Sequence, residues 1–507
     1  MGNLLVGRDM KDYFKVFLRE SDHRKAIYLL GLSGTGKSTL MANMALAFHS
    51  MGDGVMVVDT KDGVLTSELA GVTPRPEDTV YVAPGLCRWD GEWHYWGLNL
   101  LEYDKEASRR GVKVADRIAT SVLDIYERMD QFESGLMTQV GEHLEMSVRL
   151  AIARPGATFL DVRKVLTEPE YRRFLMDTYT VPPEVREHWE RFERMTPNEK
   201  QRAVTSTVPR IHKLTVSPVL NFMVTQEETT LRLSEWLDAG KLVLIDLGSG
   251  DIEPRIGRTI GNLIMALAVN AAFARQDAEK EDKRHWRFLV DEFHRIAPEQ
   301  FAELIDLIRS RRVWPVLAHQ NKEQLKDGRS HKSQLLKSVS GVPVNFTFDV
   351  SDEDRHYIKQ YQGEEAAETV RGMPQHTARL SVRGSLPDSG FPCQVALLPL
   401  AGEYREEQRQ RLIDAQRPFT RPERELAAFN RRRYYDRQGE TQGDTSRGND
   451  RRTDRHNRKA QKDQTEPIPA RPERPPTTDR DDRAGSGDPV PPRPAPIRHR
   501  RSDPDDF

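Results

Sequence analysis

A glycine-rich segment that ends in lysine and serine is the strongest chemical signal in the sequence. Residues 31–38 read G-L-S-G-T-G-K-S and match the P-loop pattern G-x-x-x-x-G-K-[ST]. Such a loop wraps phosphates with backbone N–H groups, and the N-terminus of the next helix faces the negative charge. We expect Lys37 to reach the β- and γ-phosphates of ATP and the Ser38 hydroxyl to ligate Mg²⁺. The predicted nucleotide-binding residues are Gly31, Ser33, Gly34, Thr35, Gly36, Lys37, Ser38 and Thr39.

Two adjacent carboxylates follow a short apolar segment much later in the chain. Residues 286–290 are typical of a buried strand, and Asp291 and Glu292 come directly after it. Such a pair also occurs in ordinary solvated turns, but a P-loop needs a second acidic site for its metal. We therefore expect Asp291 to hold Mg²⁺ through water and Glu292 to polarise the attacking water as general base. Asp246 also ends an apolar strand but lacks a following glutamate, which makes it the second candidate.

The next apolar strand is expected at 313–317, and Gln320 lies just beyond it. A glutamine beside the second acidic site can contact the γ-phosphate or the attacking water and so couple hydrolysis to movement. Pro315 is unusual inside a strand, because proline disrupts a central ladder, and it could shorten this one. Arginines just before the strand can either enter a neighbouring subunit's active site or stabilise a helix end. These are Arg309, Arg311 and Arg312.

The elements around these motifs alternate between strand and helix in two parts of the chain. Apolar strands are expected at 26–30, 55–59, 80–82, 242–247, 288–290, 313–317 and 344–348. Between the two groups, apolar residues recur three and four apart, which indicates helices. The pattern predicts an α/β fold with a mainly parallel sheet, interrupted by one inserted all-α domain.

We divide the chain on this pattern into a split ATPase domain, an insertion and a C-terminal extension. The parts are 1–106 and 215–400 for the ATPase domain, 107–214 for the all-α insertion, 401–430 for a helical segment, and 431–507 for a disordered tail. The tail is rich in Pro, Arg and Asp and has almost no bulky apolar residues, so it cannot offset the entropy of ordering. A flexible tail is the simpler interpretation, and a docking arm is the alternative.

Composition excludes several classes of protein. The net charge is -1, from 77 Lys+Arg against 78 Asp+Glu, which excludes attraction of the whole chain to nucleic acid or membrane. Two cysteines exclude a disulfide framework and a Cys-based metal site, and a reducing cytoplasm is expected. The N-terminus has no apolar signal segment, and the longest apolar run, 263–273, is shorter than the roughly 20 residues of a membrane span. We therefore expect a cytoplasmic chain without a transmembrane segment, which partners could recruit to the inner face of the membrane.

Two further groups of residues are weaker candidates for a site. Asp59, Lys61 and Asp62 follow the second expected strand at the edge where α/β sites form. An aromatic cluster could stack bases, although packing of a surface hairpin is the simpler interpretation. It consists of Trp89, Trp93, Tyr95 and Trp96.

Together the ordered motifs resemble the FtsK–HerA superfamily of DNA-pumping ATPases, and within it the TraD/TraG-type coupling ATPases of conjugation and type IV secretion. The resemblance covers roughly residues 4–399. It rests on a strand followed by D-T-K-D (55–62), which looks like that family's strand ending in D-x-K-x-D, the segment G-L-N-L (97–100), and a helical insertion. A strand ending at Asp246, the D-E strand, and an arginine and glutamine eleven residues apart, Arg309 and Gln320, follow in the same order. The segment G-L-N-L departs from the usual N-P-L of that family.

The resemblance implies a RecA-like core, a homohexameric ring with ATP at the subunit interfaces, and DNA passing through the centre. It makes Arg309 the leading arginine-finger candidate and Gln320 the sensor, and it places the all-α domain at one mouth of the channel. The family's usual N-terminal transmembrane helices, N-terminal β-barrel and C-terminal winged helix are not evident, which indicates a trimmed member.

Several functions fit these observations. The first is a motor that translocates single- or double-stranded DNA as a coupling ATPase, with relaxase-type or secretion partners. The alternatives are a protein-cargo secretion ATPase, which the slightly acidic folded part favours, a HerA-like or viral packaging ATPase, and a nucleotide-gated docking platform.

Overall fold

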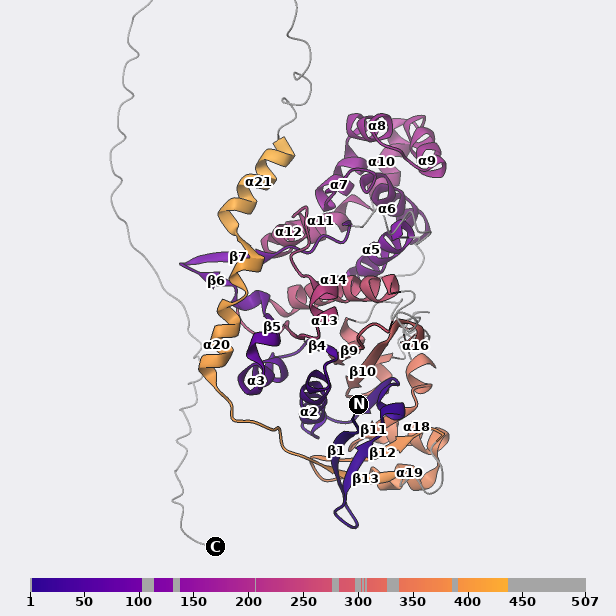
Figure 1. Cartoon of the computed structure of the whole chain (residues 1–507). Coiled ribbons are helices and arrows are strands. Elements are labelled where there is room, and N and C mark those ends of the chain that lie inside the picture. Colours follow the sequence, from indigo (N-terminus) through magenta and orange to yellow (C-terminus); the bar gives the residue numbers. More distant parts are fainter. Residues whose placement is uncertain are drawn as a thin grey trace, which may run out of the picture. The chain divides into compact units, whose positions relative to one another are not determined.

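An 11-stranded sheet forms the centre of the computed structural model (Figure 1). Its strand order is β2-β1-β13-β12-β11-β3-β10-β9-β4-β8-β5. The structure describes residues 2–102, 114–130, 137–205, 207–275, 282–296, 302, 305, 308–325, 337–384 and 391–435. Residues 1–440 form one compact unit, and the tail predicted from residue 431 lies outside the described residues from 436 onward.

Strands from β11 to β5 run parallel and form the α/β core that the sequence predicts. In sheet order they are β11 (Val344–Thr347), β3 (Ile27–Leu30), β10 (Val313–His319), β9 (Trp286–Asp291), β4 (Gly54–Asp59), β8 (Leu242–Asp246) and β5 (Thr79–Val82). Parallel strands of this kind are buried on both faces, which explains their almost continuous apolar sequences.

Four antiparallel strands extend this core and were not expected from the sequence. They are β2 (Lys15–Leu18), β1 (Leu4–Asp9), β13 (Cys393–Leu397) and β12 (Thr377–Val382). The pairing of β1 with β13 depends on close backbone contact at Gly7, where a Cβ atom would lie 2.3 Å from the carbonyl oxygen of Ala396. The N-terminal strand β1 is thus joined in one sheet to β13, which lies far later in the chain.

Helices cover the two faces of the sheet and bury alternate residues of each strand. Ile27 and Leu29 of β3 pack on the side of α2 (Lys37–Ser50) and α3 (Val64–Val72), whereas Tyr28 and Leu30 pack on the opposite side. That side holds α13 (Leu233–Asp238) and α14 (Pro254–Ala274). Beyond β10 and β11 lie α16 (Ile308–Arg311), α18 (Asp352–Gln362) and α19 (Glu364–Thr369). Helix α14 is long and apolar enough to cross a membrane by composition alone, but 72% of its apolar window is buried within the protein.

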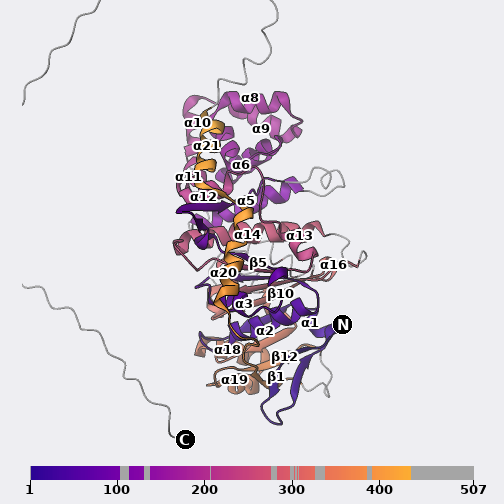
Figure 2. The ribbon, with the colours of Figure 1, turned by 60° about the vertical axis from the view of Figure 1, so that its left-hand side comes forward.

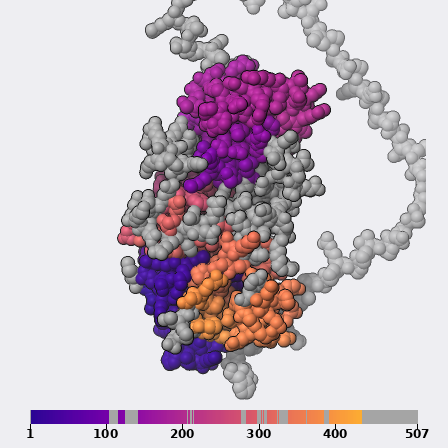
Figure 3. All heavy atoms as spheres, turned by 90° about the vertical axis from the view of Figure 1, so that its right-hand side faces the viewer, coloured from indigo at the N-terminus to yellow at the C-terminus, as the bar shows by residue number. Residues whose placement is uncertain are grey.

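An all-α segment lies at the far side of α14 from the sheet (Figures 1 and 2). It comprises α5 (Val114–Asp130), α6 (Met137–Ala151), α7 (Phe159–Thr167), α8 (Pro169–Thr178), α9 (Pro183–Glu193), α10 (Pro197–Thr205), α11 (Val208–Val216) and α12 (Pro218–Val224). In Figure 3 these purple and magenta residues gather at one end, and the indigo N-terminal residues gather at the other. Trp189 is fully buried among these helices.

A C-terminal strap, residues 406–435, connects the sheet region to the all-α segment (Figure 2). It consists of α20 (Glu406–Asp414), β14 (Thr420–Pro422) and α21 (Glu423–Tyr435), and β14 pairs with β7 (Glu92–Trp96) of the hairpin formed with β6 (Arg88–Trp89). Trp96 of this hairpin is buried and stacks on Phe419. The aromatic cluster is therefore packed against the strap, as its simpler interpretation predicts.

Proline 315 does not shorten its strand. Strand β10 runs two residues beyond the expected 317, to His319. Pro315 pairs with Phe288 of β9, whereas pairing with β3 begins only at Val316. Pro315, which has no N–H, therefore lies before the point where β10 begins to pair with β3. For this reason a proline is tolerated in a strand at the centre of the sheet.

Candidate nucleotide-binding site

The P-loop has the conformation that its glycines permit. It connects β3 to α2 at the carboxyl edge of the parallel strands, and Gly34 and Gly36 have φ values of 78° and 108°. Residues with a Cβ atom rarely adopt these angles, so glycine is needed at both positions. Gly31 is required for a different reason, because a Cβ atom there would lie 2.5 Å from the Cβ atom of Phe348.

Lys37 begins α2 and lies over the loop that precedes it. Its Nζ atom donates hydrogen bonds to the carbonyl oxygens of Gly31, at 2.7 Å, and Leu32, at 2.8 Å. Burial lowers the pKa of Lys37, and the nearby charges of Asp291 and Glu292 act in the opposite direction. The ammonium group is thus already held beside both the loop and the acidic pair.

Asp291 ends β9 in a buried, acidic environment. Burial, followed by the charges of Glu292 and Asp59, raises the pKa of the Asp291 carboxyl to about 7. Its Oδ1 atom accepts a hydrogen bond from the Glu292 N–H at 3.0 Å, and its backbone oxygen accepts one from the Thr60 hydroxyl at 3.3 Å. A carboxyl group so placed is readily stabilised as an anion by a cation, which fits a role in holding a metal.

Glu292 is the most unusual side chain of the site. It is only 3% exposed and has a φ of 48°, in the left-handed region. Among the described residues, its Oε2 atom has no hydrogen-bond partner, although His294 Nδ1 lies 3.5 Å away. A buried polar atom without a hydrogen bond is costly, and such atoms in native proteins often serve a chemical role.

One cavity of about 230 Å³ brings the two motifs together. Of the predicted residues, it is lined by Ser33, Gly34, Gly36, Lys37, Ser38, Thr39, Asp291, Glu292 and Gln320. Gln320 reaches it from the end of β10, as expected. Gly31 and Thr35 do not line the cavity; Thr35 instead donates a hydrogen bond to the Leu32 carbonyl at 2.8 Å and so shapes the loop.

The other sequence candidates occupy different positions. Arg309 belongs to α16, but its side chain lies outside the part of the structure that is described. Arg312 forms an ion pair with Asp282 at 2.7 Å and donates to the Lys283 carbonyl, so its contacts are structural. Asp246 accepts hydrogen bonds from the Gly248 and Ser249 N–H groups and from the Tyr81 hydroxyl. Its carboxylate therefore stabilises a turn and does not line the cavity.

Further residues line the cavity without having been assigned to the site from the sequence. They are Asp59, Lys61, Asp62, Val64, Leu65 and His376. The segment D-T-K-D, residues 59–62, was a signal for the first three, and Asp59 accepts hydrogen bonds from the Lys61 and Leu65 N–H groups. No pattern marked His376, because its position depends on the unexpected antiparallel strands.

The donor set fits a magnesium nucleotide better than a metal held by protein alone. Among the described residues, no group of three or more His, Cys, Asp or Glu side chains could hold a metal ion. Mg²⁺ is usually bound by one or two protein oxygens together with substrate phosphates and water. The Ser38 hydroxyl and the Asp291 carboxylate in one cavity supply such a pair of oxygens.

Comparison with solved structures identifies the fold. The bacterial conjugative coupling protein TrwB, without its first 70 residues, is 15% identical, covers 79% of this chain and 90% of its own, and has a TM-score of 0.56. VirB4 of Thermoanaerobacter pseudethanolicus is 11% identical over 80% and 98%, with a TM-score of 0.51. The plasmid coupling protein TrwB in complex with ADP and Mg²⁺ is 17% identical over 78% and 90%, with a TM-score of 0.54. No family model and no curated protein matches the sequence.

The protein therefore has an α/β fold with a mainly parallel central sheet, and the fold class predicted from the sequence motifs is confirmed. Within that class, its fold is similar to those of TrwB and VirB4.

Proposed function

We propose that this protein is an ATP-hydrolysing ring motor that translocates DNA, as a coupling ATPase of conjugative transfer or type IV secretion. The observation that carries the proposal is the single cavity in which Lys37, Asp291, Glu292 and Gln320 meet. Binding of ADP and Mg²⁺ by a protein of the same fold supports the choice of ligand.

In this proposal the side chains have distinct roles. Lys37 exchanges its carbonyl contacts for the β- and γ-phosphate oxygens, and Ser38 and Asp291 hold Mg²⁺, which neutralises phosphate charge when bound. Glu292 accepts a proton from water as the water oxygen attacks the γ-phosphorus and the bond to the β–γ bridging oxygen breaks, releasing ADP and phosphate. The Oε2 atom of Glu292 has no hydrogen bond within the described residues and so is free to accept one from the attacking water, and Gln320 orients that water.

Two substitutions test hydrolysis. We expect Lys37→Ala to abolish binding of ATP, and Glu292→Gln to retain binding while lowering turnover by about 100-fold or more, the usual contribution of a general base. Glu77→Gln, at an exposed position outside the cavity, is the matched control. Turnover by Glu292→Gln equal to that of the unmodified protein would refute the hydrolytic role and favour a nucleotide-gated docking platform.

The cargo is tested separately. A DNA motor should hydrolyse ATP faster when single- or double-stranded DNA is added, and the DNA affinity should fall as salt is raised. A hexameric preparation whose hydrolysis is unchanged by both kinds of DNA would contradict the DNA cargo. The protein-secretion alternative would then be preferred.

A further inference from the structure

His376 lies beside the P-loop although it is far from it in sequence. It directly precedes β12, which runs antiparallel to β11, while β11 runs parallel to β3. The beginning of β12 therefore reaches the carboxyl edge of the sheet, where the P-loop leaves β3. This topology places His376 among the residues that line the nucleotide cavity.

The backbone of His376 is fixed by hydrogen bonds on both sides. Its N–H donates to the Thr35 carbonyl at 2.9 Å, and its carbonyl accepts from the Leu397 N–H at 2.7 Å. Its φ of 58° is in the left-handed region, which a residue with a side chain adopts only when its surroundings require it. A Cβ atom added to Gly36 would lie 3.0 Å from His376 Nδ1. The imidazole is thus held against the last glycine of the loop, yet it remains exposed.

Strand order shows which half of a nucleotide would face this ring. Gln320 and the acidic pair come from β10 and β9 on one side of β3, and His376 comes from β12 on the other. The γ-phosphate must point toward the acidic pair, so the chain of phosphates leaves the P-loop in the opposite direction. The nucleoside is then directed toward β11 and β12.

We propose that His376 contacts the ribose and base of the bound nucleotide and is a specificity-determining residue of the site. Its exposed imidazole can stack on a purine ring or hydrogen-bond to a ribose hydroxyl, and Leu397, whose Cδ1 atom would lie 3.3 Å from a Cβ on Gly36, extends the same wall. This inference rests on the proposed nucleotide binding and adds a residue to it.

The test compares ligands with and without a nucleoside, using the full chain. Binding of Mg²⁺–ATP and of Mg²⁺–tripolyphosphate is measured by calorimetry for the unmodified protein, His376→Gly and His356→Ala. Glycine accepts the positive φ, so the backbone is kept, and His356 is an exposed control on α18. We expect His376→Gly to weaken ATP binding by about tenfold, the loss typical of one base contact, with tripolyphosphate binding unchanged.

The outcomes separate this inference from the proposed function. If His376→Gly binds ATP as tightly as the unmodified protein, the proposed role of His376 is overturned. If His376→Gly loses the same affinity for ATP and for tripolyphosphate, the role is also overturned, because His376 then only shapes the loop. If the unmodified protein binds neither ligand, the proposed nucleotide binding itself fails. A thermal unfolding scan of each variant verifies that it is folded.

Discussion

The acidic pair at the end of β9 concentrates negative charge at the wall of the cavity. Burial and the charges of Glu292 and Asp59 raise the pKa of Asp291 there, whereas Lys37 and the hydrogen bond from the Glu292 N–H lower it. With a pKa of about 7, Asp291 is close to half protonated at neutral pH before any cation arrives. Binding of Mg²⁺ requires the deprotonated form, so it should release a proton and depend on pH.

The raised pKa predicts how stability changes with pH in the absence of ligands. Because the folded protein binds the Asp291 proton more tightly than the unfolded chain, this contribution is complete below the ordinary pKa of 3.8 and is lost as pH rises through about 7. Asp291→Asn should therefore be more stable than the unmodified protein at pH 8, by about 1–3 kcal/mol, with little difference at pH 4. Urea unfolding at both pH values measures this, with the more exposed Asp62→Asn as control. Parallel pH profiles for the two proteins would contradict the assignment.

The same group predicts the pH dependence of catalysis. Hydrolysis at limiting Mg²⁺ should fall as pH decreases through about 7, because a proton then competes with the metal for Asp291. Raising the Mg²⁺ concentration should move the midpoint to lower pH. Steady-state ATPase assays at several Mg²⁺ concentrations test this, and a midpoint independent of Mg²⁺ would exclude competition at this carboxyl.

At the scale of elements, the C-terminal strap joins the nucleotide site to the all-α segment. At one end, Gln408 of α20 donates hydrogen bonds to the carbonyls of Ala70 and Thr73, at 2.9 and 3.0 Å, at the end of α3. Helix α3 begins beside the cavity, which Val64 and Leu65 line. At the other end, Arg433 of α21 lies against the all-α segment. The strap thus contacts both α3, beside the cavity, and α7 of the all-α segment.

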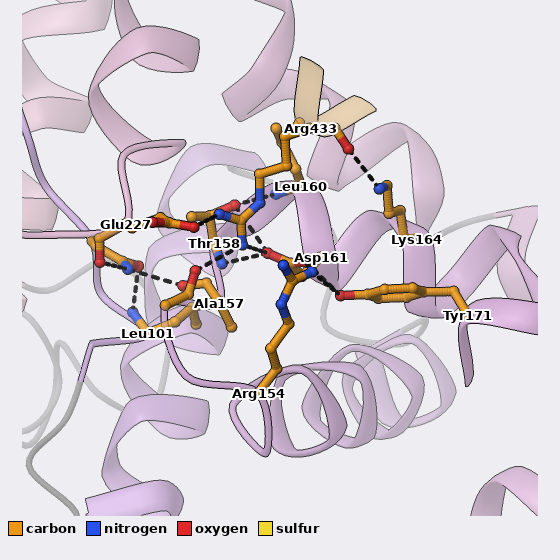
Figure 4. A network of polar contacts seen from close by, with 12 residues as sticks. Leu101, Arg154, Ala157, Thr158, Leu160, Asp161, Lys164, Tyr171, Glu227 and Arg433 are labelled. Atoms are coloured by element: carbon orange, nitrogen blue, oxygen red, sulfur yellow. Dashed lines mark hydrogen bonds and ion pairs between the residues drawn. The ribbon is translucent and has the colours of Figure 1, made fainter. Parts of the chain in front are cut away.

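The contact at the far end of the strap is a buried charge network (Figure 4). Asp161 of α7 is 1% exposed; its Oδ2 atom accepts from Arg433 at 2.8 Å and from the Thr158 N–H at 2.7 Å, and its Oδ1 atom accepts from Arg154 and the Tyr171 hydroxyl. Burial alone would raise the pKa of Asp161, but Arg433 and the other donors outweigh it and lower the pKa. The stability that this carboxylate contributes is present above its ordinary pKa and lost in acid as pH falls through the lowered value.

We predict that Arg433→Ala destabilises the protein by about 2 kcal/mol at pH 7, because it leaves a buried carboxylate with fewer donors. Arg432→Ala, at the exposed neighbouring position, should change stability by about 0.5 kcal/mol or less. Urea unfolding gives both values, and a double-mutant cycle with Asp161→Asn should show a coupling of about 1 kcal/mol or more. Additive effects of the two substitutions would mean that the ion pair does not hold α21 in place.

At the scale of the whole molecule, the proposed ring would allow a neighbouring subunit to complete the candidate active site. The described residues of the cavity include Lys37 and Lys61 but no arginine. The leading finger candidate, Arg309, lies on α16 beside β10. A neighbouring subunit could supply this arginine, since head-to-tail contacts in a closed ring bring one surface of each subunit to a different surface of the next.

Mixing two inactive variants tests whether Arg309 acts in trans. Lys37→Ala and Arg309→Ala should each be inactive, but a mixed ring contains interfaces in which the intact P-loop of one variant faces the intact Arg309 of the other. We expect ATPase activity to reappear on mixing, at a fraction of the unmodified level. Arg312→Ala is the control: it loses a structural ion pair and should be destabilised, and mixing it with Lys37→Ala should not restore ATPase activity in the same way. Failure of the mixture, when each variant still forms the ring, would remove Arg309 as the trans residue.

The parallel core and the two motifs that line the cavity could be predicted because their signals are local. A buried parallel strand is an apolar run of a few residues, and the P-loop and the Asp291–Glu292 pair are contiguous in sequence. Strands β1, β2, β12 and β13 were missed, and the pairing that joins the two hairpins could not be predicted because it links distant parts of the chain, such as Gly7 with Leu397, and depends on a glycine that looks ordinary in sequence. The role of Pro315 was also misjudged, because it depends on where the neighbouring strand begins.

By itself the sequence determined the α/β class, the P-loop and the identity of the acidic pair, since each depends on residues close together in the chain. Only the tertiary structure decided that Asp246 organises a turn while Asp291 and Glu292 face Lys37. It also brought His376 to Gly36 and Arg433 to Asp161, across hundreds of residues. Strand order and burial set these contacts, and both depend on the packing of the complete fold.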